Sequence, residues 1–328
     1  MPSAGPGEAL VRVRASGLCA SDLHIIDGDV PTVSLPFWPG HELAGEVVEV
    51  GPALPDKPHS IRPGDRVVSL IDVTCGKCVY CLKGTTNLCR HLKRTGFERS
   101  GSHAEYAVVP AANLRPIPDG IGWAEAAIVP DAVASAHHAL VTRGMAAPGE
   151  TVVVIGAGGL GLHAVQMAVA MDMQVYALDV RPEALKMAAD WGATVIQTDV
   201  ENPVDRIKSE TDNLGADLVL DHVGTEQTIL QALAICRPGG RVMVVGYHDR
   251  TFPIPSYEVM LREKSIIGTR GNVAADLDAS LRLISEGKVQ PLVSRTYSLP
   301  EINDAVADLR AGRIFGRAVI VMPDDADA

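Results

Sequence analysis

The chain lacks a segment that reads as a membrane span or a secretory signal. No run of about 18 apolar residues is free of polar residues. The best candidate, Leu160–Leu178, is interrupted by His163, Gln166, Asp172 and Gln174. The first residues have no basic region followed by an apolar core. We therefore expect no secretory signal, no membrane partner and a cytoplasmic location.

An excess of basic residues is also missing. The chain has 40 acidic and 29 basic side chains, which gives a formal net charge of −11. A chain this acidic has no general electrostatic attraction to nucleic acid or to anionic lipid. Internal repeats and low-complexity tracts are absent as well. We therefore expect neither nucleic acid nor a membrane surface as a partner.

What the chain does contain is typical of an ordinary globular protein. Its 328 residues are 47% hydrophobic and 21% charged. A chain of this length is more often two domains than one, and each can bury a core.

The six cysteines are too unevenly placed for a disulfide framework. Four of them, Cys75, Cys78, Cys81 and Cys89, form two C-x-x-C steps that share a cysteine, followed after seven residues by the fourth. Four thiolates on one short irregular lobe, 72–95, suit a closed structural zinc site. An iron–sulfur cluster is the alternative, although its usual bacterial run has three residues before the last cysteine.

A glycine-rich turn marks the second half. Thr151–Ile155 is rich in β-branched residues and leads into G-x-G-x-x-G, and an Ala-rich helical segment follows. Gly156 permits the turn, Gly158 lets a pyrophosphate approach the backbone, and Gly161 lets the helix pack closely on the strand. Phosphates would bind the free N–H groups at the start of that helix, so Gly159 and Leu160 join the candidate cofactor contacts.

The acidic residue that should read the cofactor's ribose is Asp179, at the end of the next strand, Gln174–Leu178. A carboxylate about 20 residues past the glycines binds ribose hydroxyls and repels a 2′-phosphate. The pattern therefore predicts NAD. Arg181, two residues later, leaves NADP open as a minor alternative.

The order of elements predicts an α/β fold. Up to about Trp123 the chain reads mostly as strands, and the stretch from Ala124 to Arg143 is Ala-rich and helical. Strands and helices then alternate, which implies a doubly wound parallel sheet. Cys236 is expected in a helix, Thr225–Arg237, as a small buried residue. The predicted strands are Thr151–Ile155, Gln174–Leu178, Thr194–Ile196, Leu218–Asp221, Arg241–Val245 and Ser265–Gly268.

Two further motifs, Cys19-Ala20-Ser21-Asp22-Leu23-His24 and Gly40-His41-Glu42, precede the cysteine lobe. In this order, with the lobe and the glycine turn, they resemble the zinc-dependent medium-chain alcohol dehydrogenase family over nearly the whole chain. The resemblance implies a β-rich GroES-like catalytic domain, residues 1–132 with 286–328, and a Rossmann NAD-binding domain, residues 133–285.

The resemblance also implies roles. Cys19, His41 and Asp131 match ligands of a catalytic zinc, and Glu42 matches the adjacent carboxylate. Many members have cysteine where this chain has Asp131. Ser21 and His24 match the proton relay, and Asp22 looks like the carboxylate that orients a zinc-bound histidine. On the cofactor side the matching residues are Ser135, Val223, Val245, Gly246 and Arg317, the last of which resembles an arginine that neutralises pyrophosphate.

The implied activity is hydride transfer between NAD and a primary, secondary or polyol alcohol, with two zinc ions per chain. Relatives are dimers or tetramers, so a homodimer or homotetramer is expected. Two alternatives remain open: a non-catalytic NAD-binding relative of structural or regulatory role, and a reductase of activated double bonds, whose members generally lack the catalytic zinc ligands.

Overall fold

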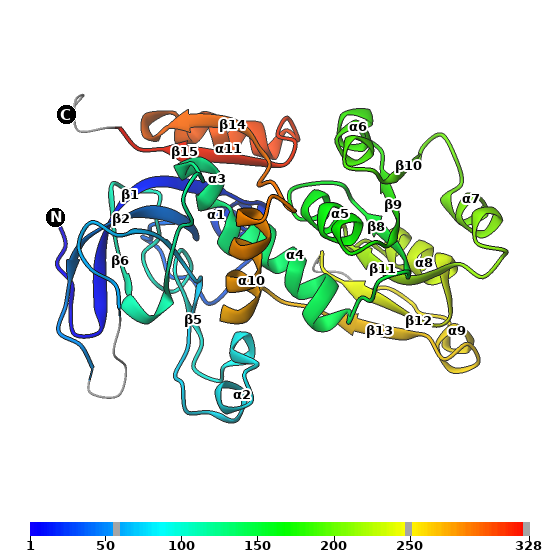
Figure 1. Ribbon diagram of the computed structural model, residues 1–328, viewed down its shortest axis with the longest axis horizontal. Coiled ribbons are helices and arrows are strands. Elements are labelled where there is room, and N and C mark those ends of the chain that lie inside the picture. The colour runs from blue at the N-terminus through cyan, green and yellow to red at the C-terminus, as the bar shows by residue number, and fades with distance from the viewer. Residues whose placement is uncertain (55–59, 247–250, 324–328) are drawn as a thin grey trace. The chain divides into compact units, whose positions relative to one another are not determined.

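The computed structural model describes residues 1–54, 60–246 and 251–323. They form two compact units, shown in Figure 1. Unit 1 comprises Met1–Ala134, Asn272–Ser285 and Pro291–Ala328, and unit 2 comprises Ser135–Gly271 and Glu286–Gln290. No helix among the described residues is both long and apolar enough to cross a membrane.

Unit 1 is built on a mostly antiparallel sheet of order β14-β15-β1-β2-β3-β7, with β6 also paired to β1. Strand β1 is the longest, because alternating residues such as Val11 and Val13 bury one face. The strands of this sheet are β1 (Glu8–Leu18), β2 (Glu42–Val50), β3 (Arg66–Ser69), β6 (Tyr106–Pro110), β7 (Leu114–Pro116), β14 (Val293–Ser298) and β15 (Arg317–Val321). A separate two-stranded ribbon, β4 (Asp72–Val73) with β5 (Lys93–Arg94), begins and ends the cysteine lobe.

The helices of unit 1 are short. They are α1 (Ala20–Ile26), α2 (Val79–Leu82), α3 (Trp123–Ala127), α10 (Ala274–Ser285) and α11 (Ile302–Arg310), with single turns η1 (Thr86–Leu88), η2 (Ala111–Asn113) and η5 (Leu299–Glu301). The sequence predicted 133–285 as a separate nucleotide domain, whereas α10 packs within unit 1.

Unit 2 has the predicted doubly wound parallel sheet, of order β10-β9-β8-β11-β12-β13. The strands are β8 (Thr151–Ile155), β9 (Gln174–Asp179), β10 (Thr194–Gln197), β11 (Ala216–Asp221), β12 (Cys236–Val244) and β13 (Ser265–Gly268). The helices are α5 (Gly161–Ala170), α6 (Pro182–Asp190), α7 (Pro203–Glu210), α8 (Glu226–Ile235) and α9 (Ser256–Met260). The strand order reverses between β8 and β11, and ligands of such sheets bind outside the strand ends at that point.

One local prediction is refined and another was wrong. The stretch predicted as helical, Ala124–Arg143, is helical, but its geometry changes along its length: it consists of α3, a π-type turn η3 (Val129–Val133), α4 (Ala134–His137) and a second π-type turn η4 (His138–Arg143). Pro130 lies in η3, and proline lacks the N–H that a regular α-helix needs there. Cys236 is buried as expected, but it begins β12 instead of lying in a helix.

Candidate active site and metal centres

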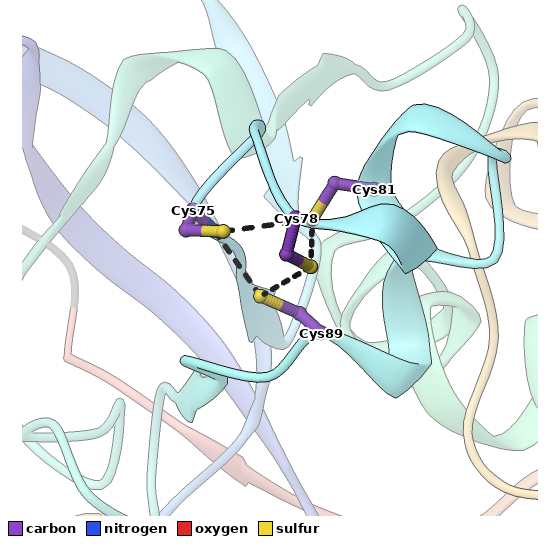
Figure 2. Close-up of side chains that lie close together, drawn as sticks. All are labelled: Cys75, Cys78, Cys81 and Cys89. Atoms are coloured by element: carbon purple, nitrogen blue, oxygen red, sulfur yellow. Dashed lines mark hydrogen bonds between the residues drawn. The ribbon is translucent and has the colours of Figure 1, made fainter.

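The cysteine lobe brings its four sulfurs together, as Figure 2 shows. The Sγ atom of Cys81 lies 3.6 Å from that of Cys78 and 4.0 Å from that of Cys75, and the sulfurs of Cys78 and Cys89 are 4.0 Å apart. Cys78 immediately precedes helix α2, and Cys81 lies in it. All six cysteines of the chain are free of disulfides.

Backbone amides around the lobe stabilise sulfur in its charged form. The N–H groups of Cys75 and His91 donate to Cys89 Sγ at 3.3 and 3.4 Å. Amide N–H groups lower the pKa of Cys78 to about 6, while burial and the neighbouring thiols raise that of Cys81 to about 11. Four sulfurs with amide donors around them fit a closed metal site.

The second cluster is assembled from distant segments of unit 1. One ligand atom each of Cys19, His41, Glu42 and Asp131 lies within 4.8 Å of all the others. Cys19 Sγ is 3.5 Å and His41 Nε2 is 3.8 Å from Asp131 Oδ2. The sequence-predicted ligand set thus meets at one place in the structure.

Strand pairing explains how this set meets. Gly17, near the end of β1, pairs with Glu42, the first residue of β2. A side chain at position 17 would overlap the carboxylate of Glu42, so glycine makes the room that this carboxylate occupies. Cys19 follows β1 directly and His41 precedes β2 directly, so the register of these two strands sets the position of both.

Asp131 comes from the π-type turn η3 rather than from a regular helix. The buried Asn272, which precedes α10, donates a hydrogen bond of 2.7 Å to the carbonyl of Pro130. Turns of this type are frequent at functional sites, because the extra residue re-aims a side chain. Here the turn carries a carboxylate to the cluster.

Arg317, at the start of β15, is the cation of this cluster. Its Nη2 lies 2.6 Å from Asp131 Oδ2 and 3.0 Å from Glu42 Oε1, and its side chain is 7% exposed. The sequence assigned Arg317 to the cofactor's pyrophosphate, but its partners in the structure are these two carboxylates. Family resemblance gave no sign of this pairing.

Burial and pairing act differently on the two acids. Burial raises the pKa of Glu42 to about 8 against the opposing charge of Arg317. The pKa of Asp131 is lowered, because His41 and Arg317 outweigh its burial. Burial alone would lower the pKa of His41, but the carboxylates of Asp22 and Asp131 raise it well above its ordinary value. The surroundings of this cluster therefore stabilise positive charge.

These observations test whether a metal fits. Glu42, Asp22 and Asp131 bring three carboxylates into buried surroundings, and Arg317 supplies one positive charge. Glu42 Oε2 is buried without a hydrogen-bond partner among the described residues. Buried charge of one sign needs compensation by a paired charge or a metal ion. Sulfur, imidazole and carboxylate are the ligands of zinc, so the residues fit that ion.

The candidate proton relay lies on α1. Ser21 Oγ is 3.7 Å from Cys19 Sγ. His24 is three residues later and therefore on the same side of the helix. Its ring is 32% exposed, with Nδ1 at 3.5 Å from Asp29 Oδ2. The hydroxyl is thus beside the ligand cluster, and the imidazole reaches solvent.

The glycine turn of unit 2 joins β8 to α5. Gly156 has a φ of 89°, in the left-handed region that favours glycine. A Cβ at Gly161 would overlap the carbonyl oxygen of Gly156, whereas one at Gly158 would meet only Arg181 Nη2, at 3.8 Å. Gly159 and Leu160 complete the turn, and Leu160 directly precedes α5. The turn is therefore tight at Gly161 and open at Gly158.

Asp179 ends β9 beside this turn. It accepts a hydrogen bond of 2.9 Å from the N–H of Ala157 and two from the guanidinium of Arg181, at 3.0 and 3.1 Å. Although burial opposes it, these partners lower the pKa of Asp179. Asp179 is therefore ionised, and Arg181 is bound to it.

Three other cofactor candidates fall at the carboxyl end of the same sheet. Val223 follows β11, and Val245 and Gly246 follow β12. The N–H groups of Val245 and Gly246 both donate to the carbonyl of Asp221, at 2.9 and 3.0 Å. Ser135 is buried in α4. β11 borders the point where the strand order reverses.

Comparison with known families supports both units. An alcohol dehydrogenase GroES-like domain model matches residues 5–119, and a zinc-binding dehydrogenase model matches residues 159–286. An alcohol dehydrogenase of Geobacillus stearothermophilus is 36% identical over 327 residues, which cover 99% of this chain and 94% of that protein.

The chain belongs to the zinc-dependent medium-chain alcohol dehydrogenase family.

Solved structures agree with this family. The alcohol dehydrogenase TADH from Thermus sp. ATN1 has a TM-score of 0.89 and 35% identity, covering 97% of this chain and 93% of that one. A crystal structure of AibC has a TM-score of 0.92 and 35% identity, covering 99% and 90%. The GroES-like and Rossmann-type domains expected from the sequence are thereby confirmed, and the chain is an enzyme of the alcohol dehydrogenase class.

Proposed function

We propose that this alcohol dehydrogenase transfers a hydride between NAD and a primary, secondary or polyol alcohol, giving an aldehyde or a ketone. Unit 1 would be the catalytic part and unit 2 would bind NAD. One observation carries the proposal: Cys19, His41 and Asp131, far apart in sequence, present a thiol, an imidazole and a carboxylate to one point, with Glu42 beside them.

Cys19, His41 and Asp131 would hold the catalytic zinc, and the four lobe cysteines would hold the structural zinc. A thiolate and a carboxylate together balance the charge of Zn²⁺, as two thiolates do. Glu42 is a fourth possible ligand within reach, and its Oε1 is paired with Arg317. Bound zinc lowers the pKa of a ligated oxygen, by roughly nine units in the case of water, so that an alcohol can lose its proton near neutral pH.

The proton of the alcohol would leave through α1. The hydroxyl of Ser21 can accept a proton while donating its own, so it passes charge without holding it. The imidazole of His24 then receives the proton, because it lies one turn further along the helix and is partly exposed. An imidazole suits a group that must both take up and release a proton.

The cofactor would lie at the carboxyl end of the unit 2 sheet. NAD supplies the acceptor for the hydride. The pyrophosphate would approach the turn at Gly158, and the ionised Asp179 would bind ribose hydroxyls. An anionic Asp179, with Arg181 already bound to it, disfavours the 2′-phosphate of NADP. Ser135, Val223, Val245 and Gly246 would contact the nicotinamide side.

Metal content and cofactor reduction together test the proposal. We expect two zinc ions per chain and NAD reduction with some of a panel of simple alcohols and polyols, followed by absorbance. One zinc without turnover would indicate a non-catalytic relative. No zinc, with reduction of activated double bonds, would indicate a reductase. The partner would be a small alcohol or carbonyl compound, and a homodimer or homotetramer is the expected assembly.

A further inference from the structure

Three buried polar atoms of unit 1 face one another at distances too long for ordinary hydrogen bonds. Asp22 Oδ1 lies 3.5 Å from His41 Nδ1 and 3.9 Å from His103 Nε2. All three atoms are buried, and none has a hydrogen-bond partner among the residues that the structure describes. Buried polar groups are normally paired, so three unpaired atoms at one point require an explanation.

The other nitrogen of His103 is firmly held. Nδ1 lies 2.8 Å from the hydroxyl oxygen of Ser16, which lies 2.7 Å from that of Ser102. An ionised carboxylate can only accept hydrogen bonds, so Asp22 needs a proton on Nε2 of the facing ring. Nδ1 must then accept from Ser16, and Ser16 from Ser102. Only this tautomer lets a neutral ring accept from Ser16 at Nδ1 and face Asp22 with a proton on Nε2.

The backbone around His103 also supports the segment that carries His41. The N–H of Gly101 donates to the carbonyl of Trp38, that of Ser102 to Gly40 and that of His103 to Pro39, at 2.8, 2.8 and 3.0 Å. A side chain at position 40 would overlap the backbone and the ring of His103, so only glycine fits there. The backbone of Gly101–His103 therefore holds the segment that leads to His41, while the side chain of His103 faces the Asp22 carboxylate that His41 also faces.

We propose that His103 is a positioning residue, which shares the carboxylate of Asp22 with His41 and thereby fixes the ring of His41 for zinc binding. Asp22 Oδ2 already accepts from the N–H of Cys19 at 2.9 Å, so this one carboxylate is linked to two zinc ligands. Its Oδ1 is left for the two imidazoles. Burial lowers the pKa of His103 despite Asp22, so His103 adds a donor without adding charge.

The inference rests on the proposed function, and zinc release tests it. In His103→Phe, a chelator should remove the catalytic zinc about ten times faster or more, since partners of metal ligands typically contribute 10- to 100-fold to metal affinity. The zinc of the cysteine lobe serves as the internal control and should leave at the wild-type rate. His103→Gln, which keeps an N–H donor, should lie nearer to wild type.

Two further variants keep the test decisive. Ser16→Ala removes the partner of Nδ1 and should accelerate release less than His103→Phe. Ser280→Ala removes a buried hydroxyl of α10 in the same unit and should change neither zinc. If His103→Phe does not fold, the test uses Ser16→Ala and His103→Gln. Both should release the catalytic zinc faster than wild type and the lobe zinc at the wild-type rate. With cobalt in place of the catalytic zinc, the visible absorption bands should shift in His103→Phe and not in Ser280→Ala.

The failures are distinguishable. A wild-type chain that holds only the lobe zinc overturns the proposed function. A wild-type chain with two zinc ions, whose His103 variants release both at wild-type rates with an unchanged cobalt spectrum, overturns only the role of His103. Equal acceleration of both zinc ions would likewise overturn it, because that is general destabilisation.

Discussion

The two clusters of candidate metal ligands are built in opposite ways. The lobe cluster takes four identical side chains from 15 consecutive residues, Cys75 to Cys89, and most of its members are partly exposed. The second cluster takes a thiol, an imidazole and two carboxylates from three separate segments and buries most of them. It also has a buried arginine and a shared carboxylate beside it.

This difference separates two tasks. A local cluster whose four positions are all filled by protein can close a loop, but it has no place for a substrate. A cluster built from distant strands and a π-type turn depends on the whole of unit 1, and it can be tuned by neighbours that are not ligands. The lobe is therefore expected to affect stability, and the second cluster is expected to affect chemistry.

Removing a ligand of the buried cluster should have the largest effect. Cys19→Ala or His41→Ala should lower kcat at least about a thousandfold, because a bound metal ion contributes several kcal/mol to the reaction. Zinc content should fall from two to one per chain, while NAD affinity, measured by fluorescence titration, stays near wild type. A parallel loss of NAD binding would instead mean that the fold has collapsed.

Removing a ligand of the lobe should have the opposite signature. Cys81→Ser should lose the lobe zinc and make residues near 75–89 sensitive to protease, since structural zinc contributes directly to folding. The thermal midpoint should fall, while kcat per folded molecule stays within about tenfold of wild type. Cys236→Ala, at the buried cysteine outside both clusters, is the matched control and should keep both zinc ions. A thousandfold loss of kcat in Cys81→Ser would erase the distinction between the clusters.

The smallest effect is expected from a change beside Glu42, within the buried cluster. Gly17→Ala places a methyl group where the Glu42 carboxylate lies, and such overpacking costs about 1–3 kcal/mol. The thermal midpoint should drop by a few degrees and kcat should change modestly. In Gly268→Ala the added methyl group meets no atom within 4 Å, so that variant should behave like wild type. Equal midpoints for the two variants would show that Glu42 has room to move.

The sequence indicated the local features well. The lobe cysteines and the strand before the glycine turn are each specified by residues close together in the sequence, so a local pattern was enough to predict them. The set of Cys19, His41, Glu42 and Asp131 came from resemblance to a family, because no local rule connects residues that far apart.

What the sequence could not predict depends on tertiary structure. Arg317 was assigned to a phosphate, since a lone arginine on a strand gives no sign of its buried partners. His103 was missed, because a single histidine in a loop is ordinary until the fold places it beside Asp22. The departure from regular α-helix at Pro130 was predictable in principle from proline's missing N–H, but the π-type turn that places Asp131 in the cluster was not.

The position of Arg317 has a consequence for how the enzyme is made. The strand that begins with Arg317 pairs with the end of the first strand, with Ala318 opposite Leu18, next to Cys19. Arg317 is synthesised only after residues 1–316, which include every candidate ligand of both clusters. Until then Glu42 and Asp131 lack this arginine, so the buried cluster acquires its full set of neighbours later in synthesis than the cysteine lobe, whose ligands all lie between residues 75 and 89.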